Sequence, residues 1–193
     1  MKWLASLLLS LLVFCSFGQD EESETEETNT EVPTSMELGF DGYLGASNFG
    51  GSGGIGAKFG YKVNENFIMG PSVRVQRTWS NNIGQKFGYT IYGGGLWAHA
   101  RFGNYLFAGA EFEMLKSPLN YIFISNQRTW VPTLFFGGGF SREFNKSVRI
   151  NAGVFYDIIN NQNSPFRLSY FMKKANGTLI PVIYRIGFFF PIN

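Results

Sequence analysis

The chain has 193 residues, enough for one domain and a leader, and its formal net charge is +2. Aromatic residues make up 18% of the sequence and charged residues only 16%, compared with about 25% charged in ordinary soluble domains. The mean hydropathy of −0.04 excludes a bundle of membrane helices, and the single cysteine, Cys15, excludes a disulfide within the chain.

The N-terminal segment divides into two parts that we expect to lie outside the folded domain. Residues 1–18 have the features of a signal peptide: a basic Lys2, an apolar stretch and small residues before the expected cleavage site. Residues 19–35 contain half of the 14 acidic residues and almost no apolar ones, which predicts a disordered linker. The folded domain is therefore expected to span residues 36–193.

From residue 36 onward the sequence repeats a pattern of β-strands. Apolar residues alternate with small or polar ones, as in the run Ile55, Ala57, Phe59 and Tyr61. We expect a bulge in the fourth strand at residues 93–95, which are three consecutive glycines. The expected strands are 36–47, 52–63, 67–79, 86–102, 105–115, 129–144, 148–159 and 178–190.

The turns between these strands alternate in length. Those at 64–66, 103–104 and 143–147 are short, whereas those at 80–85, 116–128 and 160–177 are longer. Outer-membrane barrels have short periplasmic turns and longer external loops, so the pattern places both termini in the periplasm. Whether residues 166–174 form part of a strand is open at this stage.

The polar faces of the strands carry charges of both signs among many glycines. Such a face suits the narrow interior of an eight-stranded barrel, where side chains pair with one another. We therefore predict an all-β, eight-stranded antiparallel up-and-down transmembrane barrel, with a soluble β-sandwich or lipocalin-like barrel as the alternative. The expected lumen charge network is Glu37, Asp41, Lys58, Lys62, Arg74, Glu111, Glu113, Arg149, Asp157 and Arg185.

The glycine-aromatic strands, residues 156–159 followed by 163–165, and the closing residues 181–190 resemble those of a known group. The chain resembles the small eight-stranded outer-membrane barrels of the OmpA/OmpX type. More narrowly, it is similar to the PorT-like outer-membrane β-barrel family of Bacteroidota. This resemblance implies insertion by the outer-membrane assembly machinery and implies no substrate.

Catalytic and binding motifs are few. His99 is the only histidine, and it lies near the end of the fourth strand without a local nucleophile or base array. Glu111 and Glu113 are expected to pair with cations more readily than to act as an acid and a base. We predict no cofactor, no metal and no nucleic acid partner, because zinc, calcium and phosphate-loop spacings are absent from the sequence.

Aromatic and basic side chains suggest contacts at the membrane. The residues expected at interfacial girdles are Trp79, Tyr89, Tyr92, Trp97, Tyr105, Trp130 and Tyr184. The expected contact residues of the longest outer loop are Phe166, Arg167, Tyr170, Phe171, Lys173 and Lys174.

These features favour a non-enzymatic structural or interaction barrel whose lumen is filled by side chains. Its expected partners are outer-membrane lipid, lipopolysaccharide, the assembly machinery and an envelope-complex protein. Three alternatives are open: an accessory subunit of an assembly or secretion complex, a narrow channel, and a barrel enzyme that modifies lipid A.

Overall fold

The computed structural model describes residues 36–47, 50–82, 85–118, 127–144 and 147–192. The expected signal peptide at residues 1–18 and the linker at residues 19–35 lie outside the described residues. Within the described part, no helix is long and apolar enough to cross a membrane.

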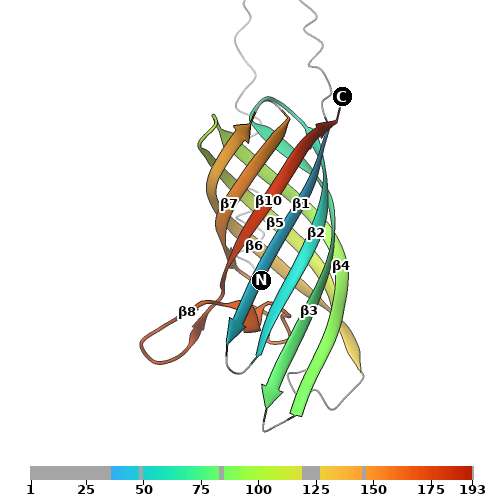
Figure 1. Ribbon diagram of the computed structural model, residues 1–193, viewed down its shortest axis with the longest axis vertical. Helices are drawn as coiled ribbons and strands as arrows, with labels where there is room; N and C mark the ends of the chain where they lie inside the picture. The colour runs from blue at the N-terminus through green and yellow to red at the C-terminus, as the bar shows by residue number, and fades with distance from the viewer. Residues whose placement is uncertain (1–35, 48–49, 83–84, 119–126, 145–146, 193) are drawn as a thin grey trace, which may run out of the picture. The chain divides into compact units, whose positions relative to one another are not determined.

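Eight long strands close into an antiparallel barrel (Figure 1), which confirms the predicted fold class. Around the barrel the strands follow the order β1-β10-β7-β6-β5-β4-β3-β2, so each strand pairs with its neighbours in sequence and β1 closes onto β10. The strands are β1 (Met36–Ser47), β2 (Gly50–Lys62), β3 (Phe67–Asn82), β4 (Gln85–Phe102), β5 (Leu106–Pro118), β6 (Arg128–Phe144), β7 (Val148–Asp157) and β10 (Val182–Ile192).

The barrel has two different ends. We call the end that carries Met36 and Ile192 the turn end; three or four residues separate the strands there, as at 63–66 and 103–105. The opposite end, which we call the loop end, carries the connections after β1, β3, β5 and β7 (Figure 1). Those after β1 and β3 are only two residues long, whereas those after β5 and β7 are the two longest. The last of these, residues 158–181, is the longest connection in the barrel.

Two local predictions were wrong. The three glycines of β4 form no bulge: Gly93, Gly94 and Gly95 pair without interruption with β3 and with β5. The predicted loop at 80–85 is mostly strand, because β3 continues to Asn82 and β4 starts at Gln85. Polar residues at a strand end look like a loop in sequence, although here they continue the ladder beyond the rest of the wall.

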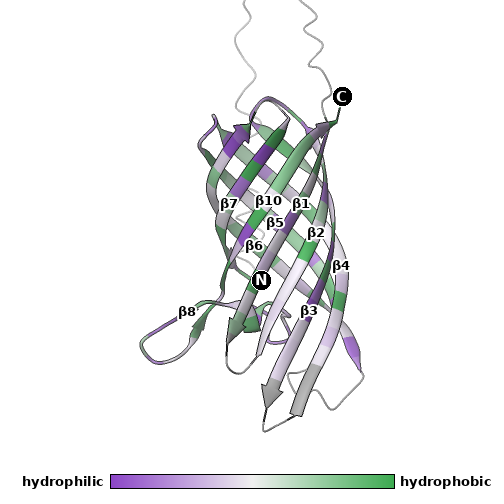
Figure 2. Cartoon of the chain, viewed as in Figure 1, coloured by the Kyte–Doolittle hydropathy of each residue, from purple (hydrophilic) through white to green (hydrophobic). Residues whose placement is uncertain are grey.

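Side chains alternate between the outside and the inside of the barrel along every strand, as β1 illustrates. Phe40 and Leu44 point outward and are 48% and 58% exposed, whereas Asp41 and Tyr43 point inward and are almost fully buried. Figure 2 shows the corresponding bands of hydrophobic and hydrophilic residues along the strands. The charged face is therefore the interior and the aliphatic and aromatic face is the exterior, which is the reverse of a soluble β-barrel.

Inward glycines make room for the large side chains of the lumen. Gly109 lies beside the His99 ring, and a Cβ at this glycine would be 2.9 Å from His99 Nε2. Gly42 points outward, and the nearest atom to a Cβ there would be the Gly54 carbonyl oxygen at 3.5 Å. The inward Gly109 and the outward Gly42 can therefore be compared as a test position and its control in the same barrel wall.

We expect Gly109→Ala to lower the free energy of unfolding by about 1–3 kcal/mol, because the His99 ring must move away from Glu111. Gly42→Ala should leave stability unchanged or raise it slightly. Urea unfolding of the refolded protein in detergent micelles measures both. Equal effects of the two substitutions would contradict this account of the inward glycine.

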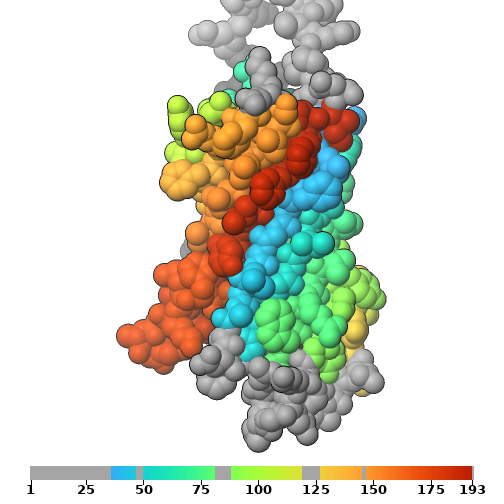
Figure 3. Space-filling model, in the orientation of Figure 1, coloured from blue at the N-terminus to red at the C-terminus, as the bar shows by residue number. Residues whose placement is uncertain are grey.

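The connection between β7 and β10 folds partly into the mouth of the barrel. It contains a short 3₁₀ turn, η1 (Arg167–Ser169), and a small hairpin of β8 (Met172–Lys173) and β9 (Leu179–Ile180). Residues 166–174 are therefore a turn and a two-residue strand, which answers the question left by the sequence. Figures 1 and 3 show the hairpin standing out sideways from the wall.

Candidate functional site: the barrel interior

The middle of the lumen holds a group of charged side chains that we call the ionic layer. Its members are almost fully enclosed: Arg74, Lys58, Glu111 and Glu113 are each 1–2% exposed. Three cations face three carboxylates, so the formal charges balance. The ionic layer consists of Asp41, Lys58, Arg74, Glu111, Glu113 and Arg185.

Each charge of the ionic layer contacts more than one opposite charge. Lys58 Nζ lies 3.0 Å from Asp41 and 2.5 Å from Glu111. Arg74 donates from Nη2 to Asp41 at 3.0 Å and from Nε to Glu113 at 2.8 Å. Arg185 completes the network by pairing with Glu111 and, at 3.3 Å, with Glu113. Buried charges arranged in this way hold strands β1, β2, β3, β5 and β10 in one register.

His99 adjoins the ionic layer and does not reach the lipid-facing side. Its Nε2 is 3.1 Å from Glu111, and its ring packs against Trp97 and Phe107 with centroids 4.8 and 5.0 Å apart. An enzyme that acts on lipid would need this histidine at the outer rim. Its position inside the lumen instead favours the structural interpretation of the residue.

Apolar layers enclose the ionic layer on both sides. Toward the turn end Ile68, Trp97 and Phe189 form one buried cluster. The prediction that Trp97 belongs to an outer aromatic girdle was wrong, since this side chain points inward and is 2% exposed. The second cluster lies mostly toward the loop end, although its Phe107 packs beside His99 near the start of β5; its members are Tyr43, Ile91, Phe107, Leu115, Phe135, Phe155, Phe166, Tyr170 and Ile183.

The turn-end opening holds a separate pair of ion clusters. Arg101 makes a bidentate pair with Glu37 at 2.6 and 2.7 Å, and Lys62 lies 3.2 Å from the same carboxylate. Arg149 pairs with Glu143 beside them. Sequence reasoning missed Arg101, because Arg101 is the penultimate residue of its strand, where alternation is hard to follow.

At the loop end Asp157 fastens the connection between β7 and β10. Its carboxylate accepts hydrogen bonds from the Tyr170 hydroxyl at 2.9 Å and from the backbone N–H of Asn160 at 3.1 Å. Nearby, the Ser169 hydroxyl donates to the Ser52 carbonyl of β2 at 3.2 Å. Asp157 is thus inside the barrel but does not join the ionic layer.

The six expected contact residues of the longest loop divide into two groups. Phe166 and Tyr170 are buried in the barrel mouth, so predicting them as outer contacts was wrong; aromatic residues in a loop fill the nearest apolar space. Arg167 is half-buried and donates to the Asn160 side chain. Phe171, Lys173 and Lys174 are exposed on the β8–β9 hairpin.

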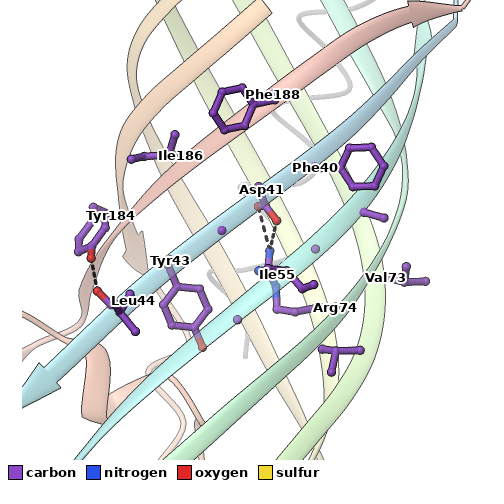
Figure 4. A pocket seen from close by; sticks show the side chains of 15 residues that line it. Phe40, Asp41, Tyr43, Leu44, Ile55, Val73, Arg74, Tyr184, Ile186 and Phe188 are labelled. Atoms are coloured by element: carbon purple, nitrogen blue, oxygen red, sulfur yellow. Dashed lines mark hydrogen bonds and ion pairs between the residues drawn. The ribbon is translucent and has the colours of Figure 1, made fainter.

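The space left in the ionic layer is small. A void of about 10 Å³ lies among Asp41, Lys58, Glu111 and Arg185, and its volume admits one water molecule at most. A much larger groove, of about 820 Å³, lies on the outer wall over the small residues of β1 and β2. Figure 4 shows Ile186 and Phe188 on one side of this groove, with Ile55, Val73 and Phe40 away from them.

Among the residues that the structure describes, no three His, Cys, Asp or Glu side chains are placed to hold a metal ion. The carboxylates of the ionic layer pair with arginine and lysine instead. Its arrangement therefore supports packing and register, and it presents no nucleophile to the outside of the barrel.

Comparison with known proteins gives structural similarity only. No protein-family model matches the chain, and no curated protein matches it. The N-terminal β-barrel domain of Pseudomonas aeruginosa OprF is similar with a TM-score of 0.45 and 13% identity, over 82% of this chain and 98% of that one. Yersinia pestis Ail, solved in a phospholipid nanodisc, gives 0.45 and 12%, over 82% and 99%. Neisserial surface protein A gives 0.42 and 16%, over 81% and 95%.

Proposed function

We propose that this chain is an integral outer-membrane β-barrel protein with a structural or interaction role and no enzymatic activity. The observation that carries the proposal is that apolar side chains point out of the barrel and charged side chains point into it. Side chains such as Ile55, Val73 and Phe140 are 73%, 63% and 74% exposed, while the charges of the ionic layer are enclosed. Exposing so much contiguous apolar surface to water is unfavourable, whereas lipid chains would cover it.

The filled interior favours a barrel with a closed lumen and argues against an open channel. Apolar clusters cover the ionic layer on both sides, and Phe166 from the long connection lies across the loop end. Ions would have to displace paired charges and several packed rings to pass. We therefore propose that the lumen conducts no steady current.

The finer assignments belong to the same proposal. Residues 1–18 direct export, residues 19–35 form a tether, and both ends of the barrel domain face the periplasm. In the interaction role, an envelope-complex protein or lipopolysaccharide contacts the loop end.

Heat-modifiability of the outer-membrane fraction on gels tests the location. We expect the unboiled protein to migrate differently from the boiled protein, because a closed barrel resists detergent until it is heated. The same preparation reconstituted into planar bilayers should give no steady conductance. A protein found in the soluble periplasmic fraction without a gel shift would contradict the membrane location, and stable conducting steps would favour the channel.

A further inference from the structure

Three cations gather on the outer wall at the edge of its apolar band. The Arg77 guanidinium donates to the Thr90 hydroxyl at 3.1 Å, and the Arg128 guanidinium donates to the Thr90 carbonyl at 3.0 Å. Lys116 lies over the Trp130 ring, 5.3 Å from its centroid. We call Arg77, Lys116 and Arg128 the cationic patch; it spans the adjacent strands β3, β4, β5 and β6.

The cationic patch lies at the loop-end edge of the apolar band. On β4, β5 and β6 the outward residues just before it are Tyr92, Met114 and Trp130, and on β3 Arg77 lies between the outward Val75 and Trp79. The next outward positions on these strands are Arg77, Thr90, Lys116 and Arg128. In a membrane this level is the boundary between the lipid chains and their headgroups, where aromatic side chains and cations gather.

The wall is shaped to receive the Arg77 side chain. Gly88 points outward on β4, and a Cβ at this position would lie 2.9 Å from Arg77 Nη2. The glycine therefore lets the guanidinium lie against the wall beside Thr90. Arg128 reaches the same threonine from β6, across β5, so two guanidinium groups converge on one point.

Within the described residues, none of these three cations forms an ion pair with a carboxylate. The loop-end half of the sequence offers almost none: across residues 44–54, 75–92, 114–134 and 156–184 the only acid is Asp157, which is buried. The same segments hold seven cations, the three of the patch with Lys86, Arg167, Lys173 and Lys174. The loop end is thus cationic on its outside.

We propose that the cationic patch binds the phosphate groups of membrane lipid headgroups in the leaflet around the loop end. Guanidinium groups bind phosphate through paired hydrogen bonds, and the apolar band directly beside them would contact the acyl chains of the same lipid. The inference rests on the proposed membrane location. It adds a defined lipid site, which a barrel that merely spans the membrane does not require.

The test uses the full chain in neutral detergent, with native mass spectrometry to count bound bisphosphorylated lipid A. Each cation near a lipid surface contributes a few-fold in affinity, so R77Q/K116Q/R128Q should bind roughly a hundredfold more weakly. R142Q is the matched control, since Arg142 is an outward cation at the turn end that stacks on Phe144. Lipid A stripped of its phosphates should bind the wild type and the triple variant equally.

A second variant, Gly88→Val, keeps the charge constant and displaces the Arg77 guanidinium. If lipid binding depends on the position of the Arg77 guanidinium, Gly88→Val should bind lipid A several-fold more weakly. Lipid A binding at the wild-type level by Gly88→Val would contradict the proposed site. Loss on K173Q/K174Q but not on the triple variant would place the lipid on the hairpin and also overturn the proposal. So would inorganic phosphate binding as tightly as the lipid.

Failure of this inference is distinguishable from failure of the proposed function. A wild-type protein that shifts on heating but binds lipid A no better than the triple variant would refute the site and keep the membrane barrel. A wild-type protein without a gel shift would remove the membrane location on which both rest. The gel shift of each variant also shows whether it has folded.

Discussion

Replacing Glu111 by Gln should lower the free energy of unfolding by about 3–5 kcal/mol, because it removes one carboxylate from a buried network and leaves its cations uncompensated. Glu111 contacts Lys58 at 2.5 Å, pairs with Arg185, and lies 3.1 Å from His99. A glutamine can hydrogen-bond to one of these groups but cannot balance two positive charges. Urea unfolding in lipid vesicles, followed by the loss of the heat-dependent gel shift, measures the change.

Two controls separate charge balance from general damage. Glu143→Gln removes a carboxylate of the same chemistry from the partly exposed pair with Arg149, and it should cost about 1 kcal/mol or less. Glu111→Gln combined with Lys58→Met restores equal numbers of opposite charges in the ionic layer. This double variant should recover at least half of the lost stability, and a loss equal to the sum of the two single losses would contradict the network.

The ionic layer shows what sequence can predict about this fold. Period-two alternation places Asp41, Lys58, Arg74 and Arg185 on one face of their strands, and the structure brings these four side chains together inside the barrel. The alternation fixes which residues share a face. It does not give the register between strands, so the partner of each charge emerges only when the barrel closes.

The alternation of polar and apolar residues did not predict the direction of several other side chains. Trp97 was expected at the outer surface because tryptophan is common at membrane interfaces, but its ring fills the lumen and its N–H donates to the Pro71 carbonyl. Phe166 and Tyr170 lie in a connection without periodicity, where no pattern indicates direction. Their position depends on the empty mouth of the barrel, which is a property of the closed structure.

Removing the Phe166 ring should both destabilise the barrel and free the long connection. Phe166 has no exposed surface, and its ring centroid lies 5.2 Å from that of Tyr43 and 4.9 Å from that of Phe135. The Arg185 guanidinium lies 5.4 Å from the same ring. Truncation to alanine leaves a cavity next to buried charges, so we expect a loss of about 3–5 kcal/mol.

Trypsin provides an independent measure of the same change. In the wild type the exposed Lys173 and Lys174 on the hairpin should be cleaved, while the half-buried Arg167 in the 3₁₀ turn should resist. Phe166→Ala should add cleavage after Arg167, because the turn loses the ring that holds it in the mouth. Phe171→Ala is the matched control: this phenylalanine is 52% exposed, so its loss should change neither stability nor the cleavage pattern appreciably. If both variants behaved alike, the connection would not be held by Phe166. The hydrogen bond from Tyr170 to Asp157 would then be the next contact to test, by Tyr170→Phe.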